Sequence, residues 1–179
     1  MRTASIPLAS KTKSGSARRV DRDEPVKTRL IRVHKGRGGW ADDAAADYLR
    51  RLRRYGGIDE VCVRPQSFQG DVDAVRRSEG ARIQKLLQPR DRLIVLDERG
   101  RDLTSEAWAR LVDAARRDGV PTLVMALGGP YGHDPALRSK AHTVVRLAPM
   151  VLNHQVARVV ALEQLYRAWT ILRGEPYHH

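Results

Sequence analysis

Short apolar runs alternate with amphipathic segments along the chain from residue 30 onward. Runs rich in Val, Ile and Leu are typical of strands, and apolar residues three or four positions apart are typical of helices. The predicted strands are Leu30–Val33, Ile58–Arg64, Arg92–Leu96, Leu123–Leu127 and Thr143–Leu147. The predicted helices are Ala41–Tyr55, Asp71–Leu87, Thr104–Asp118, Asp134–Ala141 and Asn153–Arg173. This alternation predicts an α/β domain with a mainly parallel sheet and flanking helices.

The last predicted helix carries apolar residues on more than one face. One stripe of its helical wheel holds no polar residue, while Val159, Val160, Tyr166 and Trp169 lie outside that stripe. The stripe consists of Ala157, Ala161, Leu165, Ala168 and Leu172. One apolar face is enough to dock a helix on a sheet, so this helix has a further partner. That partner is either a second copy of the chain, in a homodimer, or the rest of the same domain around a central helix.

The first residues differ in composition from the rest of the chain. At 179 residues the chain is long enough for one domain. Residues 1–28 are rich in Ser and basic residues and hold no acidic residue before Asp21. This composition is typical of an organelle transit peptide, and the alternative is a basic tail without that role. We therefore predict a disordered basic leader at 1–28 and one folded domain at 29–179.

Basic residues outnumber acidic ones. The chain has 33 Lys and Arg against 21 Asp and Glu, a formal net charge of +12. Residues 1–29 hold eight basic and three acidic residues, which leaves +7 on the remainder. Such a surplus favours a polyanionic partner, because bound phosphates release their condensed counterions. The basic clusters are either solvated surface or phosphate contacts; they contain Arg50, Arg51, Arg53, Arg54, Arg76, Arg77, Arg116 and Arg117.

Several kinds of chemistry lack the residues they require. The apolar runs are far shorter than the roughly 20 residues of a transmembrane helix, which excludes a membrane-spanning protein. The single cysteine, Cys62, excludes an intrachain disulfide and a cysteine-based zinc site, and the histidines show no metal-ligand spacing. We expect no metal.

Because Cys62 lies between Val61 and Val63, we expect a buried core thiol. The nucleophile elbow Gly-x-Ser-x-Gly is absent, so hydrolase chemistry is unsupported.

Gly128, Gly129 and Gly132 form a glycine-rich loop directly after the fourth predicted strand. The loop is not a Walker phosphate loop, because no Gly-Lys-Ser/Thr follows it. It is not a dinucleotide fingerprint either, since that motif follows the first strand of its unit. Ligands of parallel sheets bind beyond the carboxyl ends of strands, and glycines let backbone approach a ligand closely. The loop is therefore either a ligand-binding loop or a tight turn.

Three motifs occur in order in the last third of the chain. They are the glycine loop at 127–132 (Leu-Gly-Gly-Pro-Tyr-Gly), the run at 150–155 (Met-Val-Leu-Asn-His-Gln), and the run at 163–169 (Glu-Gln-Leu-Tyr-Arg-Ala-Trp). Tyr177 and His178 follow near the end. With Leu96-Asp97 at a strand end, this combination resembles the ribosomal large-subunit pseudouridine N3-methyltransferases of the SPOUT superfamily, the RlmH family. The resemblance covers roughly residues 30–179.

The resemblance implies a fold and a methyl donor. The fold would be a five-stranded parallel α/β domain with a C-terminal trefoil knot, acting as a homodimer. The donor would be S-adenosylmethionine. Carried over from the family, the residues that hold it would be Leu96, Gly128, Leu147, Ala148, Pro149, Met150, Val151 and Leu152.

The resemblance also implies the reaction, which is methyl transfer to N3 of a pseudouridine in large-subunit ribosomal RNA on the assembled ribosome. The acceptor N3–H must lose its proton, so the site needs a base or a group that stabilises the developing anion. The candidate catalytic residues are His154, Arg167, Tyr177 and His178. Arg167 would stabilise an anion or a phosphate, and the Tyr177–His178 tail would clamp the substrate.

Tyr131, Asn153 and the final two histidines are similar to the plant and algal branch of this family. Together with the leader, which has no acidic residue before Asp21, they predict a plastid or mitochondrial protein, the alternative being the cytoplasm. Two other functions stay open. One is a SPOUT methyltransferase acting on another RNA such as tRNA, and the other is a non-catalytic module that binds ribosomal RNA during assembly. A nicotinamide-dependent oxidoreductase would need the dinucleotide fingerprint that this chain lacks.

Overall fold

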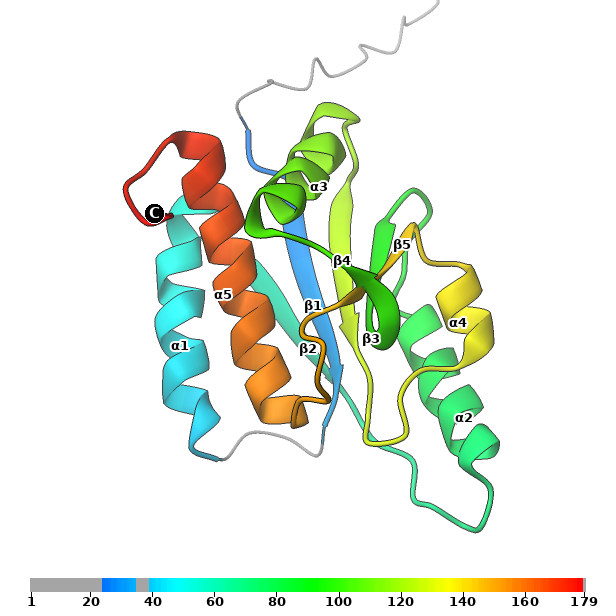
Figure 1. Cartoon of the computed structure of the whole chain (residues 1–179). Helices are drawn as coiled ribbons and strands as arrows, with labels where there is room; N and C mark the ends of the chain where they lie inside the picture. The colour runs from blue at the N-terminus through cyan, green and yellow to red at the C-terminus, as the bar shows by residue number, and fades with distance from the viewer. Residues whose placement is uncertain (1–23, 35–38, 179) are drawn as a thin grey trace, which may run out of the picture.

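The apolar runs of the sequence form one parallel sheet. The computed structural model describes residues 24–34 and 39–178, and the described strands follow the order β2-β1-β4-β3-β5 (Figure 1). The strands are β1 Lys27–Val33, β2 Ile58–Val63, β3 Arg92–Asp102, β4 Thr122–Leu127 and β5 Thr143–Arg146. All described strand pairs are parallel. The predicted α/β fold with five parallel strands is confirmed.

Helices cover both faces of the sheet. They are α1 Ala41–Leu52, the 3₁₀ turn η1 Arg53–Tyr55, α2 Val72–Gln84, α3 Ser105–Arg117, α4 Pro135–Ser139 and α5 His154–Arg173. Helices α1, α3 and α5 lie on one face, and α2 and α4 lie on the other (Figure 1). Successive strand residues serve the two faces in turn, since Leu30 packs into the first core and Ile31 into the second. Burial on both sides explains the continuous apolar runs.

Helix α5 is held against the sheet by a buried arginine. The Arg158 guanidinium donates from Nε and Nη2 to the two carboxylate oxygens of Glu60 on β2, at 2.6 and 2.7 Å, and it also pairs with Asp42 of α1. The Arg32 side chain of β1 lies 3.0 Å from the same Glu60 carboxylate. Burial makes such a network costly to break. It therefore fixes the N-terminal half of α5 relative to the carboxyl ends of β1 and β2.

Strands β1 and β3 extend several residues beyond their predicted bounds. Strand β3 continues to Asp102, past the predicted end at Leu96, because its last residues pair again with β5 after a register shift: Val145 lies opposite both Leu96 and Arg101. Strand β1 begins at Lys27, three residues before the predicted start and inside the range assigned to the leader. Burial of Val26 and pairing with both β2 and β4 explain this earlier start. Residues 1–23 of the predicted leader lie outside the described residues.

The expectation that Cys62 is a buried core thiol is wrong. Cys62 is exposed, whereas its neighbour Val63 is buried. Side chains of successive strand residues point to opposite sides of a sheet, and β2 is an edge strand, where helices cover the sheet less completely. An alternating run can therefore leave one of its apolar positions open to solvent.

The apolar surface of α5 is partly covered within one chain. The stripe residues Ala157, Ala161, Leu165 and Ala168 are buried. Tyr166 and Trp169, which lie outside the stripe, are also buried, and the Trp169 ring stacks on Tyr55 with 5.8 Å between ring centroids. Val159 and Val160 are half-buried.

Within the described residues, no helix has both the length and the apolar character to cross a membrane.

Candidate functional site

A pocket of about 610 Å³ opens at the carboxyl ends of β4 and β5 and beside the middle of β3, where the apolar part of that strand ends. Its walls are residues 96–99 in the middle of β3, residues 127–133 and 146–154 without Pro149 at and after the ends of β4 and β5, and Val72 and Arg76 of α2 with Ala157 of α5. This volume is typical of a site for a small molecule or cofactor. Its place is also the usual one, because ligands of open parallel sheets bind beyond the carboxyl ends of the strands.

The pocket brings together most of the residues that the family resemblance assigned to the methyl donor. They come from the end of β3, the glycine loop after β4 and the segment after β5. Those that line the pocket are Leu96, Gly128, Leu147, Ala148, Met150, Val151 and Leu152. Pro149 is not among the lining residues. Met150 and Val151 form an exposed lip, with 68% and 80% of their surfaces accessible, whereas Leu96 is buried.

The four predicted catalytic residues lie in two separate places. His154 lines the pocket, whereas Arg167, Tyr177 and His178 do not. Arg167 lies thirteen residues further along α5, and a helix rises about 1.5 Å per residue, so it stands about 20 Å from His154. Within one chain, the structure does not bring these two groups together.

Arg167 and the C-terminal tail form a cluster of their own against α1, α3 and α5. The Arg167 guanidinium donates to Glu163 Oε1 from Nε at 2.9 Å and lies 4.7 Å from the centre of the Tyr177 ring. The Tyr177 hydroxyl lies 3.3 Å from the same carboxylate oxygen. His178 Nε2 lies 2.7 Å from Glu106 Oε1 on α3. These contacts pin the tail to the surface of its own chain.

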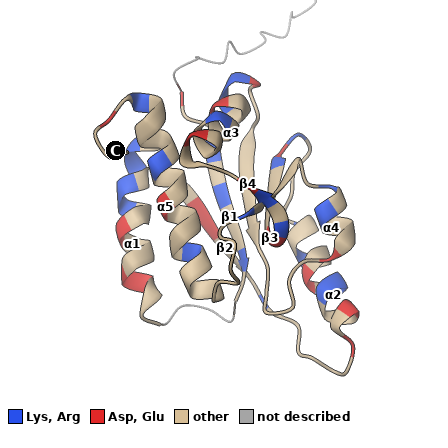
Figure 2. Cartoon of the chain, viewed as in Figure 1, with Lys and Arg blue, Asp and Glu red and all other residues tan. Residues whose placement is uncertain are grey.

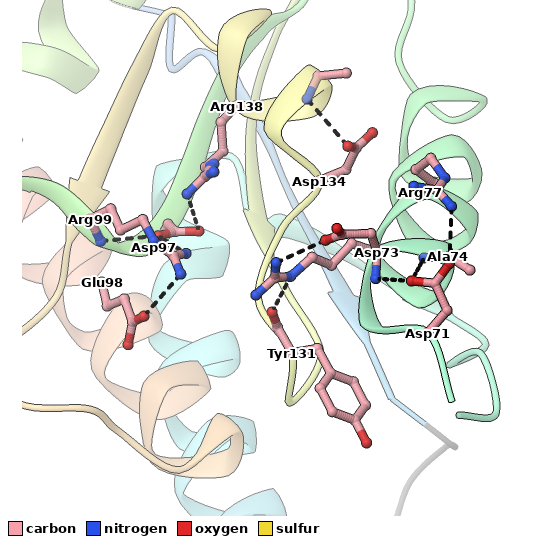
Figure 3. Close-up of polar contacts among 12 residues, drawn as sticks. Asp71, Asp73, Ala74, Arg77, Asp97, Glu98, Arg99, Tyr131, Asp134 and Arg138 are labelled. Carbon is pink, nitrogen blue, oxygen red and sulfur yellow. Dashed lines mark hydrogen bonds and ion pairs between the residues drawn. The ribbon is translucent and has the colours of Figure 1, made fainter. Parts of the chain in front are cut away.

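Asp97 places a buried carboxylate on the pocket wall, directly after the apolar part of β3. Its Oδ1 accepts a hydrogen bond from the backbone N–H of Arg99 at 3.0 Å, and its Oδ2 lies 3.7 Å from Arg138 Nη1 (Figure 3). Only 2% of the side chain is accessible. Among the described residues, no donor makes a hydrogen bond to Oδ2. Buried acceptors are almost always satisfied, so this oxygen indicates a ligand that donates a hydrogen bond or carries positive charge.

His133 is a second buried polar group on the pocket wall. Its ring nitrogen Nε2 has no hydrogen-bond partner in the described part of the chain. Burial lowers the pKa of His133, and the nearby Asp97 charge offsets this effect only in part, so the ring is neutral near pH 7. A Cβ atom on Gly128 would lie 3.1 Å from this nitrogen, tighter than normal contact. Glycine at 128 therefore lets the loop lie directly against the His133 ring.

His154 is the first residue of α5. The preceding Asn153 caps the helix, accepting a hydrogen bond from Gln155 N at 2.9 Å. The His154 ring lies 5.0 Å from the ring of His34, centre to centre. The pKa of His154 is lowered, first by burial and then by the charges of His34 and Arg32. A neutral imidazole on the pocket wall can accept a proton near pH 7.

Sequence reasoning did not assign Asp97, His133 or the α2 residues to the site. Asp97 and its charged neighbours Glu98 and Arg99 follow a buried strand, and polar residues at the carboxyl end of a parallel strand are a usable signal. Val72 and Arg76 carry no such signal, because the packing of α2 beside the glycine loop brings them to the pocket. Within the described ranges, no three His, Cys, Asp or Glu side chains gather in a way that could hold a metal ion.

Comparisons with known proteins identify the family. Residues 26–178 match a family model described as "Predicted SPOUT methyltransferase". A protein of Arabidopsis thaliana named as an RNA methyltransferase is 42% identical over 153 residues, which are 84% of this chain and 79% of that protein. Proteins of Pelobacter propionicus and Geobacter sulfurreducens, both named ribosomal RNA large subunit methyltransferase H, are each 40% identical over 154 residues, 86% of this chain and 100% of theirs. These matches span the sheet, its helices and the pocket, so the chain is a methyltransferase of the SPOUT family.

Proposed function

We propose that the protein transfers a methyl group from S-adenosylmethionine to N3 of a pseudouridine in large-subunit ribosomal RNA, on the assembled ribosome. The observation that carries this proposal is the pocket, because seven of the eight residues assigned to the donor line it. The names of the bacterial relatives support ribosomal RNA as the substrate. The basic charge of the chain is suited to a polyanion of that kind.

The residues of the pocket fit S-adenosylmethionine. The donor molecule has an ammonium group and ribose hydroxyls, which form hydrogen bonds, and Asp97 Oδ2 and His133 Nε2 are buried polar atoms without a partner among the described residues. Leu147 and Leu152 supply apolar surface for the adenine ring. When bound, S-adenosylmethionine supplies an electrophilic methyl group on a sulfonium sulfur. The carboxylate of Asp97 would attract the positive charge of this ligand.

His154 is the proton acceptor in this proposal. The pseudouridine N3–H is weakly acidic, and its proton must leave as the nitrogen attacks the methyl group. The neutral imidazole of His154 lines the pocket beside the exposed lip of Met150 and Val151, where an RNA base would enter. General-base assistance of this kind contributes about 10²- to 10⁴-fold to rate.

We propose, further, a homodimer and a C-terminal trefoil knot. The cluster of Arg167, Tyr177 and His178 lies about 20 Å from His154 along α5, so these residues would reach a pocket only from a second copy. The half-buried Val159 and Val160 and the exposed lip supply apolar surface for such a contact. The knot is supported by the irregular pairing of β3 with β5, where the register shifts and Gly100 lies against the backbone of Val145.

The arginines at the C-terminal end of α1 form a basic surface that suits an RNA substrate. Figure 2 shows Lys and Arg gathered toward the C-terminal end of α1, where Arg50 and Arg51 pair with Asp47, and Arg54 pairs with Glu175. These pairs are mostly exposed, so their guanidinium groups are available to phosphates.

The composition of the leader supports a plastid or mitochondrial location, with the cytoplasm as the alternative.

Methyl transfer to defined RNAs tests the proposal. The full chain would be incubated with S-adenosylmethionine labelled in its methyl group and, in parallel, with unmethylated ribosomes, isolated large subunits, protein-free ribosomal RNA and tRNA. We expect label in the large ribosomal RNA of assembled ribosomes and competition by S-adenosylhomocysteine. Label in tRNA alone would favour another RNA substrate. Absence of label from every RNA, despite donor binding, would favour the non-catalytic module.

A further inference from the structure

Two aromatic side chains stack on each other at the rim of the pocket. Phe68, in the loop between β2 and α2, is the single phenylalanine of the chain, and 51% of its surface is exposed. Its ring stacks on Tyr131 of the glycine loop, with 5.5 Å between centroids and 27° between planes. Tyr131 lines the pocket. A large apolar ring left half exposed at a ligand site indicates a partner that covers it.

Both rings stand on anchored backbone. Arg76 Nε of α2 donates to the Tyr131 carbonyl oxygen at 2.8 Å, and Figure 3 shows the Tyr131 ring pointing away from this contact. The loop that carries Phe68 is anchored at Gln66, whose backbone N–H donates to Glu79 Oε1 at 2.9 Å. The Gln66 side chain accepts from Ser78 at 3.0 Å and also from Arg82. These contacts anchor the backbone that carries the two rings, which reduces the entropy lost on binding.

We propose that Phe68 and Tyr131 form an aromatic platform on which an unpaired nucleobase of the RNA substrate stacks, next to the nucleotide that enters the pocket. This inference rests on the proposed function, since it takes RNA as the substrate. Flat aromatic faces are the usual partners of bases that have left a helix, whereas aliphatic side chains offer no such face. A nucleotide whose N3 is to be methylated must be unpaired, and its neighbours are then exposed for stacking.

The charges around the platform agree with this partner. Arg76 lines the pocket, and Arg77 has 62% of its side chain exposed. Their acidic partners are Asp73 and Asp71, and the Asp71 carboxylate also caps α2. Asp71 and Asp73 are thus engaged with arginine or with helix N–H groups, and Arg77 keeps most of its side chain in contact with solvent. A nucleotide that stacks its base on the rings can place its phosphate near Arg76, which contacts the Tyr131 carbonyl.

Matched substitutions at Phe68 test the platform. Phe68→Leu keeps an apolar side chain but removes the aromatic face, and Phe68→Tyr keeps the face. In the methyl-transfer assay with ribosomes, we expect Phe68→Leu to raise the KM for ribosomes about tenfold or more, the order of the effect of losing one base–aromatic stack. Phe68→Tyr should stay within about twofold of the parent. The dissociation constant of S-adenosylmethionine, measured by calorimetry, should not change in either variant.

The outcomes separate the platform from the proposed function. If the parent methylates ribosomes and Phe68→Leu has the same KM, the platform is overturned and the proposed function stands. If Phe68→Leu changes the mass of the protein in solution, a second copy covers the rings and the platform is also overturned. If the parent methylates no RNA, a single-stranded RNA containing 2-aminopurine gives a separate test. Quenching of its fluorescence by the parent and by Phe68→Tyr, but not by Phe68→Leu, supports stacking, and equal quenching by all three overturns it.

Discussion

At the scale of single residues, Asp97 is the strongest sign of what the pocket holds. A carboxylate with 2% of its side chain accessible and one oxygen without a hydrogen bond in the described chain is costly to keep. Arg99 and Arg138 compensate part of that cost, at 3.5 and 3.7 Å. The rest is recovered when a ligand donates a hydrogen bond to the free oxygen. The buried carboxylate is therefore explained by the ligand as well as by the fold.

Replacing Asp97 tests this explanation. Asp97→Asn keeps the shape and removes the charge, and a hydrogen bond to a charged group is worth about 1.5–3 kcal/mol. We expect the dissociation constant of S-adenosylmethionine to rise about 10- to 150-fold, measured by calorimetry. Asp59→Asn, the same change at an exposed position on β2, is the matched control and should bind like the parent. Unchanged affinity in Asp97→Asn would remove this residue from the donor site.

His154 should give the reaction its pH dependence. The pKa of His154 is lowered, so the neutral base persists below the ordinary histidine value of about 6.5. We expect kcat to stay level from pH 8 down through that value and to fall only at lower pH, as the imidazole takes up a proton. His154→Asn should lower kcat about 10²- to 10⁴-fold and abolish this limb, with donor affinity unchanged. His142→Asn, outside the pocket, is the control; a His154→Asn enzyme with normal kcat would exclude His154 as the base.

His133 should make the stability of the fold depend on pH. Burial lowers its pKa in the folded state, so the unfolded chain binds the proton more tightly. Stability is then complete above the ordinary histidine value of about 6.5 and falls as the pH drops below it, by up to about 1.4 kcal/mol per pH unit. Urea unfolding at pH 7, 6 and 5 measures this slope. His133→Gln should flatten it, and an identical slope in parent and variant would contradict the assignment.

At the scale of secondary-structure elements, the register shift between β3 and β5 brings their backbones unusually close. A Cβ atom on Gly100 would lie 2.5 Å from the Val145 carbonyl carbon, which no backbone tolerates without moving. Between Leu96 and Arg101 the pairing register shifts, so that both of these residues lie opposite Val145 of β5. The same segment carries Asp97 to the pocket wall, so this irregularity of the strand builds part of the site.

Gly100→Ala tests that constraint. The added methyl group must displace backbone on β5, and we expect a loss of about 1–3 kcal/mol or more in the free energy of unfolding. Donor affinity should fall as well, since Leu147 follows β5 directly. Gly57→Ala is the matched control, because it meets no atom within 4 Å but has a φ of +74°, which costs about 1–2 kcal/mol of backbone strain alone. If Gly100→Ala were as stable as the parent, the close approach would not be a constraint.

The sequence predicted the strands correctly where a continuous apolar run reflects burial on both faces of the sheet. It predicted the core of β3 but not its continuation, because Asp97, Glu98 and Arg99 interrupt the run and only pairing with β5 makes the later residues a strand. It misplaced Cys62, because an edge strand is covered less than a central one. The side of the pocket formed by α2 could not be predicted, since helix packing rather than local pattern brings Arg76 to the glycine loop.

At the scale of the whole molecule, His154 and the cluster around Arg167 lie too far apart in one chain to act on the same substrate atom. Periodicity placed His154 and Arg167 on one helix, and the resemblance assigned both to one reaction. The helix rise holds them about 20 Å apart within a chain. A twofold dimer reconciles these statements, because each pocket can then receive the tail cluster of the other copy. The sequence alone gives no distance between them.

Mass and complementation test the dimer. We expect the full chain to sediment at twice its mass of 20.1 kDa. His154→Asn and Arg167→Ala should each be inactive alone. Co-expressed, they should recover about a quarter of parent activity, because half of the dimers are mixed and each mixed dimer has one intact pocket. A monomer in solution, or no recovery in the mixture, would contradict shared sites.

The identity of the methylated nucleoside tests the proposed methyl transfer to pseudouridine most directly. Unmethylated ribosomes would be treated with the full chain and S-adenosylmethionine, and their RNA would be digested to nucleosides and analysed by mass spectrometry against synthetic standards. We expect one new product, pseudouridine carrying a methyl group on N3, found in large-subunit RNA and missing when Asp97→Asn or His154→Asn replaces the parent at limiting donor. A methyl group on any other nucleoside, or none on ribosomal RNA, would contradict it.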